Sequence, residues 1–119
     1  MTRAEFDKFC ATLPGAEHVV QWRGSSVWKV GGKIFAICAQ WRAGEGERIR
    51  FKCSDIAYRL LCERPGIEPS PYLARAKWVV ITRDDAMTDE DIRAYIREAH
   101  GIVAATLSRA KRREIGLPT

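Results

Sequence analysis

The chain has 119 residues and a formal net charge of +5; 46% of its residues are hydrophobic and 29% are charged. These proportions are typical of one ordinary soluble domain and exclude a disordered chain, which holds fewer apolar residues. No run of about 18 apolar residues occurs, so the sequence predicts no membrane-spanning helix and no membrane partner. The first residues include acids and lack an apolar stretch, so we expect no signal peptide.

Charge and cysteines add two expectations. The region 23–83 is rich in Lys and Arg, residues 84–98 are acidic, and residues 109–119 are basic again. Such asymmetry favours a basic surface that faces a partner, although a solvated surface explains it equally well. Each cysteine lies in an apolar pattern without a C-x-x-C pair: Cys10, Cys38, Cys53 and Cys62. Buried free thiols predict a cytoplasmic protein.

The first elements are predicted by caps and turns. Thr2 and Glu5 match a capping box, and apolar residues follow at helical spacing until Pro14-Gly15 ends the helix. Residues 19–22 form an apolar extended piece, and residues 23–26 form a turn.

The stretch 27–53 predicts three strands. Gly31-Gly32 joins the first two as a hairpin, because primed turns need positive φ. A polar loop over residues 42–47 leads to the third strand. There, three cations alternate with three apolar residues: Arg48, Arg50 and Lys52 with Ile49, Phe51 and Cys53. A period of two places the cations on one face of the sheet and the apolar groups on the other.

The second half alternates helices with one strand. Ser54 is a good N-cap for a helix that runs from Asp55 to about Glu63. Four of its side chains are expected to face inward: Ile56, Tyr58, Leu60 and Leu61. Residues 66–73 are expected to be irregular, because proline cannot donate to a strand ladder. Residues 77–83 predict a strand, and Thr88 with Asp91 opens a third helix with a long apolar stripe.

These elements describe a single α+β domain of residues 1–108, followed by a basic C-terminal tail of residues 109–119. The predicted order is α-β-β-β-α-β-α, a two-layer sandwich in which helices cover one face of an antiparallel sheet. The other face of such a sheet is left partly open.

The sequence resembles the MmcQ/YjbR family over nearly its whole length. The resemblance rests on five segments: LPGAE at 13–17, WKVGGKIFA at 28–36, FKC at 51–53, PYL at 71–73 and KWV at 77–79. It implies a fold like that of CyaY, the bacterial frataxin, with a double-wing arrangement of hairpins and DNA binding. One departure is Ala99-His100, where relatives tend to have Ser-Tyr, which puts in doubt any role for a hydroxyl there.

DNA binding is therefore the first functional hypothesis. Seven cations are candidates for contacts with the phosphate backbone that do not read sequence: Lys29, Lys33, Arg48, Arg50, Lys52, Arg75 and Lys77. Three tryptophans, at 28, 41 and 78, are either stacking surfaces for single strands or core residues. The alternative function is a protein-interaction module or homodimer that uses the open sheet face, with Tyr72 and Trp78 as anchors. An apolar patch favours the second hypothesis, and a continuous basic strip favours the first.

Catalysis and metal binding have weaker support. The cysteines lack an evident His or acid partner in sequence, and no P-loop, Gly-x-Ser-x-Gly or dinucleotide motif occurs, so we expect no enzyme and no cofactor. Neither His18 nor His100 has zinc-ligand spacing. The acids at 84, 85 and 89–91 suit a hard cation, but those at 89–91 begin a helix, where acids are favoured for electrostatic reasons. We therefore expect no metal site.

Overall fold

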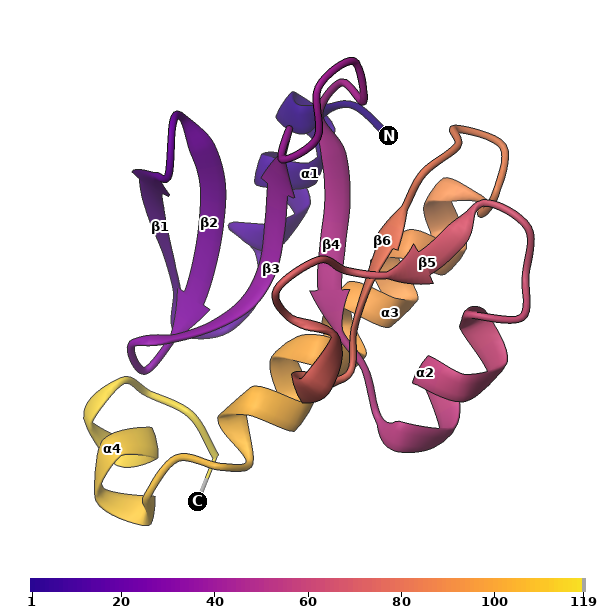
Figure 1. Ribbon diagram of the computed structural model, residues 1–119. Coiled ribbons are helices and arrows are strands. Elements are labelled where there is room, and N and C mark those ends of the chain that lie inside the picture. Colours follow the sequence, from indigo (N-terminus) through magenta and orange to yellow (C-terminus); the bar gives the residue numbers. More distant parts are fainter. Residues whose placement is uncertain (119) are drawn as a thin grey trace.

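One antiparallel sheet organises the chain. The computed structural model describes residues 1–118 (Figure 1). Its six strands lie in the order β1-β2-β3-β4-β6-β5. The elements follow one another as α1 (Arg3–Cys10), β1 (Ala16–Gln21), β2 (Ser25–Val30), β3 (Lys33–Ala39), β4 (Arg48–Lys52), α2 (Asp55–Leu61), β5 (Ile67–Pro69), the 3₁₀ helix η1 (Ala74–Ala76), β6 (Trp78–Ile81), α3 (Asp89–Ala104) and α4 (Arg109–Glu114). The predicted α+β class and antiparallel sheet are confirmed.

Helices α1, α2 and α3 begin where the sequence predicts them. The Thr2 hydroxyl accepts from the Glu5 amide while the Glu5 carboxylate accepts from the Thr2 amide, which is a complete capping box. Ser54 and Thr88 cap α2 and α3 in the simpler way, each accepting one amide of the first turn. Among the described residues, no helix is long and apolar enough to cross a bilayer.

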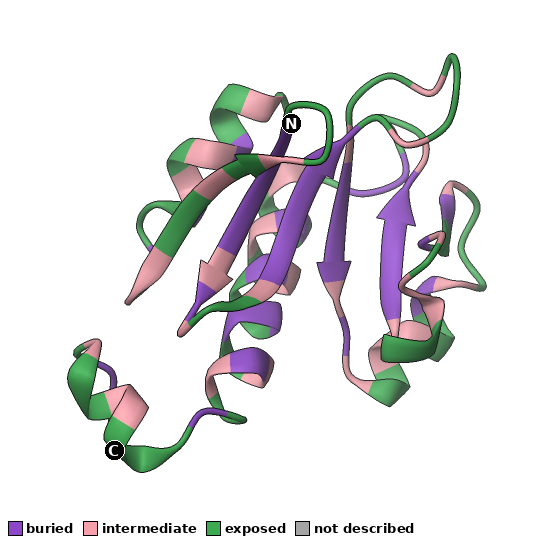
Figure 2. Ribbon diagram, turned by 60° about the vertical axis from the view of Figure 1, so that its left-hand side comes forward, coloured by how far each residue is buried: buried purple, intermediate pink, exposed green. Residues whose placement is uncertain are grey.

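The main core lies between one face of the sheet and helices α1 and α3. Phe6 of α1 and Ile96 of α3 are fully buried there against Phe35 and Phe51 of the central strands. Figure 2 shows that the central strands are mostly buried, whereas most of β1 and α4 is not. The alternation predicted for β4 is confirmed, because Ile49, Phe51 and Cys53 all belong to this core.

A bulge adapts β3 to this core. Trp28 pairs with Ala36 and the next residue, Lys29, pairs with Ile34, so Phe35 is an extra residue in β3. Phe35 and Ala36 consequently both contact the helix-side core, although neighbours in a regular strand point to opposite faces.

Four sequence predictions need correction. The predicted order α-β-β-β-α-β-α lacks β1, β5 and α4. Ile56 and Leu60 of α2 do not face inward but are 69% and 60% exposed, while Leu61 is buried. Residues 67–69 are not irregular, because they pair with β6 as a short edge strand. The region after residue 108 is more than a tail: α4 is helical and Leu117 joins the main core. Residue 119 of the predicted tail lies outside the described residues.

The Gly31-Gly32 turn offers a test of this packing. Both glycines have positive φ, 58° and 81°, but a Cβ on Gly31 would lie 2.6 Å from Leu107 Cδ1 whereas one on Gly32 would meet nothing. Gly32→Ala should cost about 1 kcal/mol from backbone strain alone. Gly31→Ala should cost about 1–3 kcal/mol more from overpacking, measured by urea unfolding. In a Leu107→Ala background the two substitutions should cost the same; an unchanged difference would contradict the proposed contact.

Candidate binding groove on the open sheet face

The face of the sheet opposite the helices carries a groove of about 890 Å³. Its walls come from three places: the β1–β2 turn, strand β3 with the residues after it, and the segment from the η1 loop to β6. The lining residues are Trp22, Arg23, Gly32, Lys33, Ile34, Ile37, Gln40, Trp41, Tyr72, Leu73 and Trp78. This volume is in the range of sites that hold drug-sized ligands. The open face is therefore hollowed, and four of the side chains that line it are aromatic.

The floor of the groove is a small second core. Val27, Ile37, Ala39 and Trp78 are buried together on this face, with Leu73 packed partly over them. Trp78 is only 5% exposed, so it supports the groove more than it reaches into solvent.

Three aromatic side chains of the groove are joined by two edge-to-face contacts, both of which involve Trp41. The Trp41 ring makes an edge-to-face contact with Trp22, with centroids 6.3 Å apart, and a second with Tyr72 at the same distance. Trp22 is 51% exposed and Tyr72 is 92% exposed, which is unusual for side chains of this size. Trp41 thus joins two exposed rings that come from distant parts of the chain.

Backbone strain is concentrated at the same place. Among the described residues, four that are not glycine have positive φ: Trp22, Arg23, Tyr72 and Lys77. Three of them line the groove. Bulky side chains rarely adopt this conformation, and strain of about 1 kcal/mol or more per residue tends to be retained at functional positions. The groove therefore has a second mark of a functional site besides its shape.

A buried ion pair holds Trp41 in place. The Arg50 side chain is fully buried, and its Nη2 donates to both oxygens of the Glu45 carboxylate at 2.9 Å. Arg50 Nη1 donates to the carbonyls of Ala39 and Arg48, and the guanidinium lies 4.4 Å from the centre of the Trp41 ring. Glu45 also accepts from the amides of Trp41 and Arg42. The loop that follows β3 is thereby folded back onto β4.

This network shifts the pKa values of both Glu45 and Arg50. Burial alone would raise the pKa of Glu45, but the amides of Arg42 and Trp41 and the Arg50 guanidinium outweigh it and hold that pKa below its ordinary value. Burial lowers the pKa of Arg50, although the hydrogen bonds to Glu45 oppose the shift. A guanidinium still remains charged at any physiological pH. The pair is therefore ionised inside the protein.

The structure does not place the seven predicted phosphate contacts on a continuous basic strip. Arg50 is wholly buried and paired, so in this conformation it cannot reach a phosphate. Arg48 lies on the same face but pairs with Asp84 at 2.9 Å and donates to the Glu45 carbonyl. Lys52 donates to the Ala76 carbonyl. Intramolecular partners thus occupy the whole row that alternation placed on one face.

The other four cations are dispersed. Lys33 lines the groove and is exposed, with Nζ 3.0 Å from Thr106 Oγ1. Lys29 lies opposite Glu17 in the β1–β2 pair. Arg75 is exposed on η1, and Lys77 stands over the Tyr58 ring at 5.1 Å. Of the seven, only Lys33 belongs to the groove.

Trp22 and Arg23 were not predicted as site residues, because residues 19–22 indicate only an apolar extended piece and residues 23–26 only a turn. A tryptophan and an arginine at a hairpin tip are a signal in themselves, since loop residues on a rigid scaffold often carry function. Of the three tryptophans considered for stacking, Trp41 and Trp78 line the groove. Trp28 is instead buried on the helix side, where its indole donates to Asp7.

Comparison with known proteins identifies the family. The model of the YjbR family matches residues 11–102. The chain belongs to the YjbR family. A crystal structure of a Deinococcus radiodurans protein with a DUF419 domain has a TM-score of 0.82 at 22% identity, over 98% of this chain and 89% of that chain. A Pseudomonas syringae protein has a TM-score of 0.72 at 16% identity, over 87% and 99%. At these identities the similarity concerns the fold, and no curated protein matches the chain.

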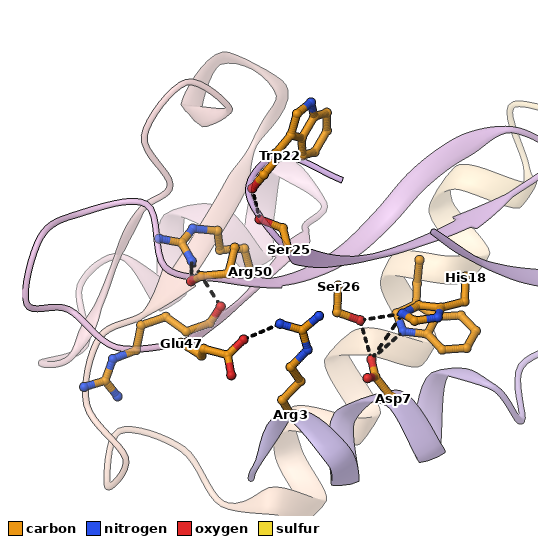
Figure 3. A network of polar contacts seen from close by, with 11 residues as sticks. Arg3, Asp7, His18, Trp22, Ser25, Ser26, Glu47 and Arg50 are labelled. Carbon is orange, nitrogen blue, oxygen red and sulfur yellow. Dashed lines mark hydrogen bonds and ion pairs between the residues drawn. The ribbon is translucent and has the colours of Figure 1, made fainter. Parts of the chain in front are cut away.

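A serine, a histidine and an aspartate meet on the helix side of the sheet in this YjbR chain (Figure 3). The Ser26 hydroxyl donates to Asp7 Oδ1 at 2.5 Å and lies 2.8 Å from His18 Nε2. This connectivity differs from that of a hydrolase triad, in which histidine accepts the serine proton and the aspartate holds the histidine. Ser26 is also fully buried. The cluster ties α1 to strands β1 and β2 and does not expose a nucleophile.

The cysteines of the YjbR chain are likewise structural. All four are free, and burial raises the pKa of Cys38 and of Cys53 to about 12 and also raises those of Cys10 and Cys62. A protonated thiol is a poor nucleophile and a poor metal ligand. Within residues 1–118, no three His, Cys, Asp or Glu side chains gather as a metal site. The acids at 84, 85 and 89 pair instead with Arg48, Arg83 and the Met1 amino group.

The buried Arg50–Glu45 ion pair predicts that substitution of Glu45 strongly destabilises the protein. Glu45→Ala leaves the Arg50 charge buried without its partner and should lower the free energy of unfolding by about 3 kcal/mol. Glu47→Ala is the matched control: Glu47 pairs with Arg3, but both side chains are about a third or more exposed, so the loss should stay below about 1 kcal/mol. Equal losses in chemical denaturation would refute the structural role of Glu45.

The lowered pKa of Glu45 gives this effect a pH dependence. The ionised carboxylate stabilises the fold fully above its ordinary pKa of 4.5, and that contribution is lost as the pH falls through the lower pKa of the folded state. Glu45→Gln cannot titrate at this position. The difference in unfolding free energy between the natural protein and Glu45→Gln should therefore be constant at neutral pH and should shrink below about pH 4.5. A difference that grows in acid would contradict the assignment.

Proposed function

We propose that this YjbR protein binds nucleic acid, and that the groove on the open sheet face is the contact surface. One observation carries the proposal: the residues that line the groove include four aromatic side chains and two cations but no carboxylate. Aromatic faces stack on bases of any sequence, and cations beside them attract phosphates. The net charge of +5 acts in the same direction at longer range.

The phosphate contacts that we propose do not lie mainly on β4, where the sequence predicted a row of three cations. Arg23 and Lys33 at the groove carry the first phosphate contacts. Lys29 and Arg75 are exposed or half-buried cations that can extend the contact, and neither forms an ion pair among the described residues. Arg48, Lys52 and Lys77 would first have to leave their present partners. Arg50 serves to position Trp41, so it is withdrawn from the phosphate-binding set.

A protein partner or a second copy of the chain is the other candidate for this face. Tyr72 favours it, because a 92% exposed tyrosine beside an apolar floor resembles the anchors of protein interfaces. Trp78 favours it less, since it is nearly buried. The absence of acids from the lining argues for a polyanion and against a basic peptide. In either case we propose that the protein acts by binding and not by catalysis. The free, protonated thiols support a cytoplasmic location.

Salt dependence tests the proposed contacts. Affinity for labelled single-stranded and duplex DNA is measured by fluorescence anisotropy from low to physiological salt. For single strands, the double variant Arg23→Gln with Lys33→Gln should reduce the slope of log K against log salt by about 1.4, because each phosphate contact contributes about 0.7.

The matched control is Arg109→Gln with Arg113→Gln, which removes the same charge from exposed positions of α4. Its slope should remain close to that of the natural protein. Equal losses in both double variants would mean that only net charge matters, and the groove would not be the site. Absence of binding to any DNA at low salt would favour the protein-partner alternative.

A further inference from the structure

We propose that the groove selects single strands, and that unpaired bases stack on the free faces of Trp22 and Tyr72. This inference rests on the proposed nucleic-acid function and adds the class of ligand and the residues that recognise it.

The four aromatic residues of the groove are not equally available. Arg50 already covers a face of Trp41, and Trp78 is only 5% exposed in the floor. Trp22 and Tyr72, in contrast, are 51% and 92% exposed, and each contacts Trp41 by an edge-to-face pair that leaves ring surface open. A base that enters the groove therefore finds its stacking partners in Trp22 and Tyr72, the two rings that contact Trp41.

Both rings already contact Trp41 before any ligand is bound. Trp22 and Tyr72 hold positive φ values of 50° and 68°, and both rings contact Trp41, which the Arg50–Glu45 pair secures. A ring that is already ordered loses little rotamer entropy when a ligand stacks on it. The backbone strain at Trp22 and Tyr72 is therefore explained if these residues must present their rings to a ligand.

Shape and charge together favour a single strand. In a duplex the bases are stacked on one another and show only their edges, so an aromatic ring cannot reach their faces. The groove, with a volume of about 890 Å³, is suited to nucleotide-sized groups and not to a whole double helix. Arg23 and Lys33 line the same groove, where they can pair with the phosphates of a strand whose bases lie on the rings. A cationic ligand in this aromatic site is disfavoured, because these two cations would repel it.

The test separates bases from phosphates. Three labelled probes are compared by fluorescence anisotropy at one salt concentration: an oligothymidylate of about ten nucleotides, an abasic strand of the same length, and a duplex. We expect the oligothymidylate to bind about ten-fold more tightly than the abasic strand, because stacking adds to backbone attraction. Trp22→Leu and Tyr72→Leu should each remove much of that ten-fold advantage and leave the affinity for the abasic strand unchanged.

Leu60→Ala is the control, because it also removes an exposed apolar side chain but from α2. Circular dichroism of each variant confirms that it folds, as expected for exposed positions. If oligothymidylate and abasic strand bind equally, or if the duplex binds best, the selection of single strands is wrong although nucleic-acid binding stands. If no probe binds, the proposed function itself fails. If Trp22→Leu and Tyr72→Leu both keep the full ten-fold advantage, the bases stack elsewhere and the inference is overturned.

Discussion

The open face of the sheet depends on one buried charge. Arg50 takes a position where an antiparallel sheet would otherwise carry an apolar or solvated side chain, and it is completely enclosed. An enclosed guanidinium requires a partner, and Glu45 can provide it only if the loop between β3 and β4 folds back over the sheet. This course of the loop places Trp41 over the guanidinium, where its ring contacts Trp22 and Tyr72. The groove is thus a consequence of how one cation is neutralised.

Much of the fold could be predicted because it rests on local signals. Thr2 with Glu5, Ser54 and Thr88 mark helix starts through their own hydrogen bonds, and the alternation from Arg48 to Cys53 correctly assigned the two faces of β4. Prediction failed where an element is too short to define a face. Helix α2 has seven residues, and its apolar side chains occur on more than one side, so Ile56 and Leu60 were placed inward although only Leu61 is buried.

The site was harder to predict than the fold, for a physical reason. The alternation of residues in β4 predicts which face of the sheet Arg50 occupies but not whether another group covers it. The partner of Arg50 lies in a loop whose course depends on Gly44 and Gly46 at positive φ. Trp22, Trp41 and Tyr72 are far apart in sequence, and they meet because the sheet brings their loops to one face. A count of cations in the sequence therefore indicated a basic strip, whereas the structure forms an aromatic groove with two cations.

The four tryptophans allow the most direct measurement of the central claim. Three of them line the groove, while Trp28 lies on the helix side of the sheet and donates to Asp7. In a titration of ¹⁵N-labelled protein with single-stranded DNA, we predict that the indole N–H resonances of Trp22, Trp41 and Trp78 shift while that of Trp28 does not. Shifts confined to the basic residues of α4, or no shift among the three groove indoles, would contradict the assignment of the groove as the binding surface.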